Sequence, residues 1–221
     1  MEDVVNRSLR YIQNFITMYP KIKSICDELI LQFDSISSER KQVLTTISEY
    51  IQHKKSEGLP IQLMYVCTHN SRRSHFGQIW AAVAASYYGV LDVTTFSGGT
   101  EATAFNQNAI QALEEIGFQI HSKENGSNPV YEVFFSDLAT PSHCFSKVYD
   151  DNFNPSSNFA AIMTCGDAEE NCPFIPGVEL RIATTYNDPK AFDGTSQTAE
   201  KYKERSLQIA LETMYVFSKV Q

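Results

Sequence analysis

Apolar residues recur every three or four positions along residues 1–57, the spacing of an amphipathic helix. Pro20 and a serine cluster at residues 35–38 interrupt the pattern, which therefore divides into separate helices. We expect an N-terminal helical extension over residues 1–57 that packs on the main domain or on a partner subunit. Its two apolar stripes are Val5, Leu9, Ile12 and Ile16, and Val43, Leu44, Ile47 and Ile51.

From Leu59 onward, short apolar runs alternate with amphipathic stretches, which is typical of parallel strands joined by helices. This pattern predicts an α/β domain over residues 58–221, with an open parallel sheet of about four strands and helices on both faces. The candidate strands are residues 61–66, 92–96, 130–135, 158–164 and 180–184. The candidate helices are residues 74–88, 106–116 and 199–219.

Composition excludes several classes of function. The net charge is −8, and the 18 Lys and Arg residues are dispersed, so we expect no nucleic-acid partner. The longest largely apolar run, residues 79–91, is too short to span a bilayer. The N-terminus has early acidic residues and no basic segment before an apolar one, so we expect no secretory signal and a cytoplasmic protein.

The chain has five cysteines at irregular spacing. An odd number without a secretion signal favours free thiols, metal ligation or redox chemistry over a disulfide framework.

The sequence YVCTHNSRRSH at residues 65–75 runs from an apolar strand into a cysteine and then into a helix start. A loop between a parallel strand and a helix presents backbone N–H groups to an anion. Arg73 can hold two oxygens of a tetrahedral oxyanion, and the same amides and helix dipole favour the thiolate form of Cys67. Spacing alone would favour a buried cysteine followed by solvated arginines. The strand before Cys67 and Ser74 at the helix start favour a catalytic anion-binding loop.

We therefore expect Cys67 to be a nucleophile and the loop after it to surround the oxyanion. The loop residues are Thr68, His69, Asn70, Ser71, Arg72, Arg73 and Ser74.

Two further motifs carry candidate chemistry. Cys165 and Cys172 in MTCGDAEENCPFIP follow a predicted strand, and they are either two core cysteines or a pair that can form a disulfide. Their spacing does not fit a zinc site, so we expect no metal. In YNDPK, Asp188 precedes a proline, a place where an aspartate is usually a turn residue.

CTHNSRRS resembles the phosphate-binding loop of the low-molecular-weight protein tyrosine phosphatases and of the arsenate reductases that share their fold. That loop reads Cys, any, Gly, Asn, any, any, Arg, Ser, and His69 stands where the family has glycine. FSGGTEATAFNQNAIQALEEIGF at residues 96–118 also resembles the second strand and helix of this family. The resemblance covers roughly residues 60–220.

The segment from Cys165 to Cys172 is similar to the redox segment of thioredoxin-coupled arsenate reductases. This resemblance implies that Cys165 attacks an adduct on Cys67 and that Cys172 resolves the resulting disulfide. It also implies that Asp188 is the general acid. Lys190 stands where the phosphatases typically have an aromatic residue, which favours a small oxyanion over an aryl phosphate.

Our first hypothesis is reduction of arsenate to arsenite, with a thioredoxin-like reductant and no cofactor. The second is hydrolysis of phosphomonoesters, such as phosphotyrosine, through a Cys67 phosphoenzyme. The third is a non-catalytic oxyanion-binding module in which the extension engages a partner. The N-terminal helices are also a candidate surface for homo-oligomer formation.

Overall fold

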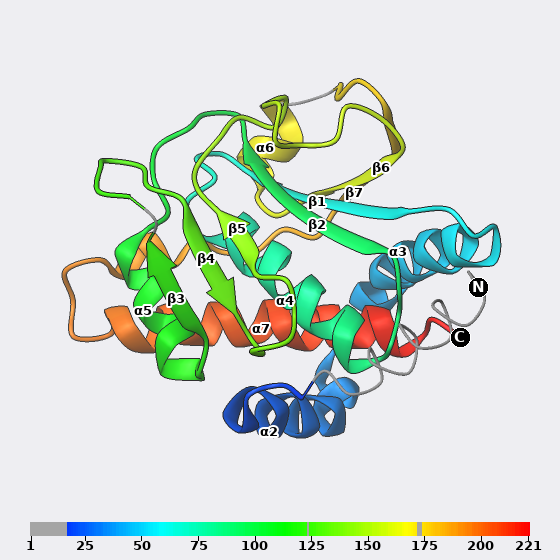
Figure 1. Cartoon of the computed structure of the whole chain (residues 1–221), viewed down its shortest axis with the longest axis horizontal. Coiled ribbons are helices and arrows are strands. Elements are labelled where there is room, and N and C mark those ends of the chain that lie inside the picture. The colour runs from blue at the N-terminus through cyan, green and yellow to red at the C-terminus, as the bar shows by residue number, and fades with distance from the viewer. Residues whose placement is uncertain (1–16, 123, 172–173) are drawn as a thin grey trace.

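The computed structural model describes residues 17–122, 124–171 and 174–221 (Figure 1). The first predicted apolar stripe, at residues 5–16, lies outside the described residues. The main sheet has four parallel strands in the order β2-β1-β6-β7, which confirms the predicted architecture. These strands are β1 (Ile61–Cys67), β2 (Val93–Gly99), β6 (Phe159–Met163) and β7 (Val178–Ala183).

The candidate strand at residues 130–135 does not lie in this sheet, so its parallel placement was wrong. It forms β4 (Tyr131–Phe134) of a separate antiparallel sheet with β3 (Gln119–Ser122) and β5 (Ser142–Cys144). A parallel crossover needs a dozen or more residues, usually with a helix. The link from β3 to β4 is too short for a crossover and contains the turn residues Asn125 and Gly126, so the chain folds back as a hairpin.

Helices cover both faces of the main sheet. On one face, Leu63 and Tyr65 of β1 join a core with α4 (Arg73–Tyr87) and α7 (Thr198–Ser218). On the other face, Met64 and Val66 pack with residues in and after the short helix α6 (Gly166–Asn171). The remaining helices are α2 (Pro20–Leu29), η1 (Ile30–Ser35), α3 (Ser38–Ser56), α5 (Gln107–Ile116) and η2 (Pro189–Phe192). Within the described ranges, no helix has the length and apolarity needed to cross a bilayer.

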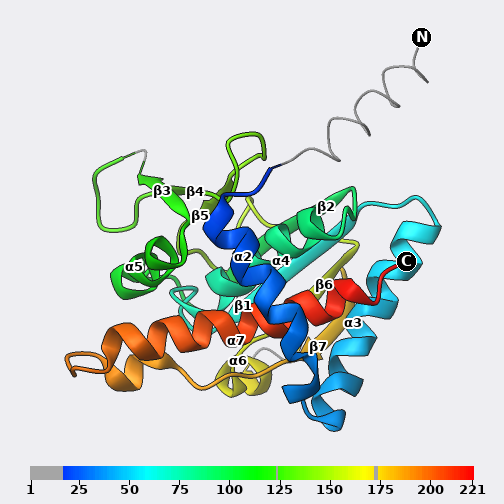
Figure 2. The ribbon, with the colours of Figure 1, turned by 90° about the horizontal axis from the view of Figure 1, so that it is seen from below.

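The helices before β1 share the core of the main sheet. Pro20 occupies the first turn of α2, and the Ser37 side chain caps α3 by accepting a hydrogen bond from the Arg40 N–H at 3.2 Å. Leu44, Ile47 and Ile51 of α3 are buried in the same cluster as the sheet residues, as their spacing predicts. Figure 2 shows α2 running across α7, with which it is in contact.

The contact between α4 and β1 leaves no room for a side chain at Gly77. A Cβ atom there would overlap the ring of Tyr65, whereas one at Gly126 would meet open space. We expect Gly77→Ala to lower the free energy of unfolding by about 1–3 kcal/mol, because overpacking outweighs the gain in helix propensity. Urea denaturation measures this difference. Gly126→Ala is the matched control and should leave stability unchanged, and equal stability of both variants would contradict the packing argument.

Candidate active site

Cys67 lies where the sequence predicts it, as the last residue of β1, and it is buried. Its Sγ is 3.1 Å from the Oγ of Ser74 in the first turn of α4. The Asn70 amide donates a hydrogen bond to the same Oγ at 2.9 Å. Ser74 and Asn70 therefore fix the thiol at the point where strand, loop and helix meet.

The loop after Cys67 carries free hydrogen-bond donors. Within the described chain, the backbone N–H groups of residues 68–72 have no hydrogen-bond acceptor. Asn70 has the positive φ of 43°, which turns successive N–H groups to one side of the chain. Asn70, Ser71 and Arg72 are buried, and buried N–H groups without acceptors are rare and need an explanation. A bound oxyanion would satisfy them.

Neighbouring backbone holds this loop in shape. The N–H groups of Thr100 and Glu101 donate to the carbonyls of Cys67 and Thr68, at 3.2 and 2.8 Å. A Cβ atom on Gly99 would lie 2.7 Å from the Asn70 nitrogen, so only glycine allows this approach. FSGGTEATAF therefore carries glycine for a steric reason.

A second segment, residues 146–147, braces the other side of the loop. The Ser146 hydroxyl donates to the His69 carbonyl at 2.8 Å, and the Lys147 N–H donates to the Asn70 side-chain oxygen at 2.9 Å. Sequence reasoning missed both residues, since nothing in FSKVYDD signals contact with a loop far away in the chain.

Arg73 is buried and held from two sides. Its Nη1 donates to the Tyr186 carbonyl at 2.9 Å, and its Nη2 donates to Asp188 at 2.8 Å. Its buried Nε has no hydrogen-bond partner among the described residues. Tyr186 was also missed by sequence reasoning, because a backbone carbonyl leaves no mark on residue type.

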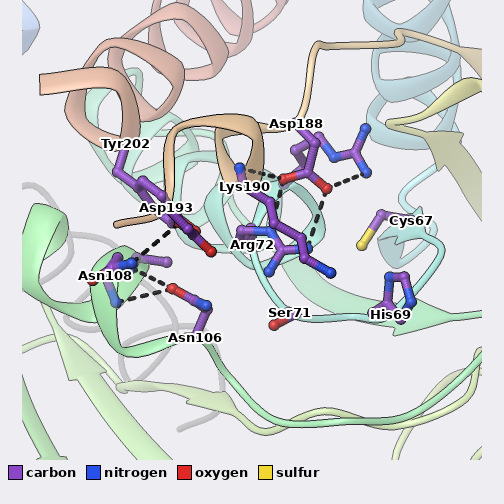
Figure 3. A network of polar contacts seen from close by, with 12 residues as sticks. Cys67, His69, Ser71, Arg72, Asn106, Asn108, Asp188, Lys190, Asp193 and Tyr202 are labelled. Atoms are coloured by element: carbon purple, nitrogen blue, oxygen red, sulfur yellow. Dashed lines mark hydrogen bonds and ion pairs between the residues drawn. The ribbon is translucent and has the colours of Figure 1, made fainter. Parts of the chain in front are cut away.

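Arg72 forms a two-point contact with Asp188, with its Nε and Nη2 at 2.7 and 3.2 Å from the carboxylate oxygens (Figure 3). The sequence suggests that both arginines contact the oxyanion. In the structure, Arg72 pairs with the aspartate of the Asp-Pro turn.

Asp188 therefore lies between two guanidinium groups. Burial by itself would raise the pKa of its carboxyl group, but the hydrogen bond from Arg72 and the charge of Arg73 outweigh burial and lower the pKa. The carboxylate also caps η2 by accepting the Lys190 N–H at 3.0 Å. At the far end of η2, Asp193 accepts hydrogen bonds from Tyr202 of α7 at 2.7 Å and from Asn108 of α5 at 3.3 Å (Figure 3).

Cys165 lies next to the loop. Its Sγ is 3.4 Å from the Thr68 hydroxyl and accepts the Ala168 N–H at 3.4 Å. Cys67 and Cys165 belong to the same buried cluster, because β1 and β6 are neighbouring parallel strands whose ends meet at one edge. Cys172 lies outside the described residues.

His69 stands where the phosphatase loop has glycine. The left-handed φ of the loop falls on Asn70 and not on His69, so the histidine requires no strained backbone here. Its ring lies 3.6 Å from the Glu101 carboxylate and is partly exposed. Over the described ranges, no cluster of three or more His, Cys, Asp and Glu side chains is arranged to hold a metal ion.

Comparison with known proteins supports the resemblance seen in the sequence. No model of a protein family matches this chain. An arsenate reductase of Bacillus subtilis (strain 168) is 28% identical over 144 residues, which cover 65% of this chain and 84% of that protein. An arsenate reductase of Staphylococcus aureus (strain Newman) is 27% identical over 127 residues, covering 58% of this chain and 77% of that protein.

Solved structures also match. A low-molecular-weight phosphotyrosine phosphatase from Vibrio cholerae matches with a TM-score of 0.48 and 16% identity, covering 72% of this chain and 95% of that one. The predicted resemblance to arsenate reductases is confirmed by these proteins of Bacillus subtilis and Staphylococcus aureus.

Asn70 offers a direct test of how the loop is held. Asn70→Gly keeps the left-handed φ but removes both side-chain hydrogen bonds, and we expect it to lower the free energy of unfolding by about 1–3 kcal/mol. Asn70→Ala should lose about 1–2 kcal/mol more, because alanine is strained at this φ. Urea denaturation of both variants separates the two effects. Wild-type stability of Asn70→Gly would mean that the hydrogen bonds contribute nothing.

Proposed function

We propose that this protein is a thiol-dependent arsenate reductase that converts arsenate to arsenite. The observation that carries the proposal is the position of Cys165, whose sulfur lies beside Thr68 at the edge of the anion-binding loop. The names of the curated relatives support the same activity.

In this proposal, the free N–H groups of residues 68–72 and the side chain of Arg73 bind arsenate above Cys67. Donors fixed in advance by the fold stabilise the charge that develops on the oxygens and need little rearrangement during the reaction. Thr68, His69, Asn70, Ser71, Arg72 and Ser74 shape the loop, and Arg72 acts through Asp188.

The Cys67 thiolate attacks arsenic, and an As–S bond forms while an As–O bond breaks. Asp188 donates a proton to the departing hydroxyl group of arsenate, which leaves as water. The Cys165 thiolate then attacks the Cys67 sulfur. The As–S electron pair stays on arsenic, which leaves as arsenite, and a Cys67–Cys165 disulfide forms.

The thiolate of Cys172 then attacks the Cys165 sulfur, giving a Cys165–Cys172 disulfide and releasing Cys67 as a thiolate. Two electrons have passed from the protein thiols to arsenic. An external dithiol protein of the thioredoxin type reduces the disulfide and resets the enzyme.

To act as an acid, Asp188 must carry a proton on its carboxyl group. Arg72 and Arg73 lower the pKa of this group and so favour its ionised form. An arriving oxyanion dianion would draw Arg73 toward itself and place negative charge near Asp188. Both changes raise the pKa of this carboxyl group. Substrate binding therefore prepares the acid.

The transfer of the disulfide from Cys67–Cys165 to Cys165–Cys172, which we call the thiol relay, is tested with Cys172→Ser. The coupled assay contains arsenate, thioredoxin and thioredoxin reductase, and it measures consumption of a reduced nicotinamide cofactor. We expect wild-type turnover and loss of steady-state turnover in the variant, because the Cys67–Cys165 disulfide has no resolving thiol. Cys26→Ser, which changes a thiol buried in the core away from the loop, is the control and should keep turnover. Full turnover of Cys172→Ser would refute the relay.

The proposed role of Asp188 as general acid is tested by the pH dependence of kcat/KM. Arg72→Met removes a hydrogen bond that lowers the pKa of Asp188, so this pKa should rise toward its ordinary value. A general acid loses activity when it deprotonates, so the alkaline limb of the profile should move to higher pH. Lys201→Met, at an exposed ion pair with Glu204, should leave the profile unchanged. An unshifted limb in Arg72→Met would exclude Asp188 as the acid.

Phosphomonoester hydrolysis is the second candidate, because Cys67, Arg73 and Asp188 are all that it requires and they lie together. Phosphatase activity that survives Cys165→Ser/Cys172→Ser, together with absent arsenate reduction by the wild type, would favour it over the reductase.

A further inference from the structure

A line of contacts connects helix α3 with the oxyanion-binding loop. Arg40 of α3 pairs with Glu212 of α7, with its Nη2 2.8 Å and its Nε 2.9 Å from the same carboxylate oxygen. The Tyr186 hydroxyl donates to that oxygen at 2.7 Å. The Tyr186 carbonyl in turn accepts the hydrogen bond from Arg73.

Tyr186 is the central member of this line. Its ring lies under the Arg40 guanidinium, 4.9 Å from the ring centroid, and its N–H donates to the Thr164 carbonyl at 3.0 Å. The side chain of Tyr186 thus contacts α3 and α7, while its backbone holds Arg73. A shift of the ring would move the carbonyl that orients Arg73.

Arg40 neutralises the charge of the buried Glu212 carboxylate. The Glu212 side chain is only 7% exposed, and a buried carboxylate needs a partner. Burial and the charge of Glu212 raise the pKa of Tyr186, so its hydroxyl keeps the proton that it donates. Without Arg40, the buried Glu212 carboxylate would lose this charged partner and would turn toward water. That movement would remove the anchor of the Tyr186 hydroxyl.

We propose that Arg40 is a positioning residue for Arg73, acting through Glu212 and Tyr186, so that the N-terminal helical extension is part of the anion-binding apparatus. This inference rests on the proposed function only in taking Arg73 as an oxyanion ligand. It assigns a role to a helix that precedes the parallel sheet in the chain.

The test compares Arg40→Met with Lys54→Met. Lys54 lies on the same helix and is itself buried, and its ammonium group lies 2.6 Å from the partly exposed carboxylate of Glu179 in β7, away from the loop. Binding of inorganic phosphate is measured by calorimetry, and kcat and KM for arsenate are measured in the coupled assay. Circular dichroism and thermal unfolding report whether each variant is folded.

We expect Arg40→Met to weaken phosphate binding by about 2- to 30-fold, the range of couplings through packed networks, and to raise KM more than it lowers kcat. Arg40→Lys should recover part of the affinity. Lys54→Met should bind phosphate like the wild type even where its thermal stability falls. Wild-type phosphate affinity in Arg40→Met would overturn the inference.

A second variant keeps the inference testable if Arg40→Met does not fold. Tyr186→Phe removes only the hydroxyl contact with Glu212, and we expect it to weaken phosphate binding in the same direction. Wild-type affinity in this variant would likewise contradict the inference. Phosphate binding that depends on Arg40 in a protein without arsenate turnover would uphold the inference and refute the reductase proposal.

Discussion

The site depends on one electrostatic constraint: two arginines buried at the start of α4 need a counter-ion, and Asp188 is that counter-ion. Truncating one member of a buried ion pair typically costs about 3–5 kcal/mol, because the remaining charge is left without compensation. These ion pairs therefore hold the Asp-Pro turn at the loop. Since Arg73 also donates a hydrogen bond to the Tyr186 carbonyl, its guanidinium is held in one orientation from two sides. In the proposed reduction, the same carboxylate donates a proton once an anion shares Arg73 with it.

Backbone geometry supplies the second half of the site. The carbonyls of the loop accept hydrogen bonds from the N–H groups of Thr100 and Glu101 and from the hydroxyl of Ser146, while its own N–H groups have no acceptor among the described residues. These contacts require two backbones to approach closely, which Gly99 permits. Parallel pairing of β1 with β6 then brings Cys165 to the same edge as Cys67. The order of strands therefore places the second thiol, without any local motif shared by the two cysteines.

The sequence predicted the elements that are recognisable from a pattern of neighbouring residues. The apolar run into Cys67, the serine at the start of α4 and the stripe of α3 each carry their own pattern, and each lies where it was expected. The run at residues 130–135 was recognised as a strand but assigned to the wrong sheet, because a short apolar run does not encode its pairing partner. For Arg72, the sequence also did not reveal the ion pair that it forms. Its partner Asp188 is 116 positions away, and residue type alone cannot reveal such a pairing.

Reduction and hydrolysis would use the same loop, arginine and acid, so the features that separate them must lie outside these groups. A free buried cysteine often behaves as a small apolar residue and needs no chemical role. Cys165, however, has its sulfur 3.4 Å from the Thr68 hydroxyl of the loop, a contact that packing alone does not require. A thiol fixed beside a reactive sulfur gains greatly in effective concentration over one in solution. Hydrolysis gains nothing from such an arrangement, since water is its second reactant, whereas reduction needs a second thiol at this place.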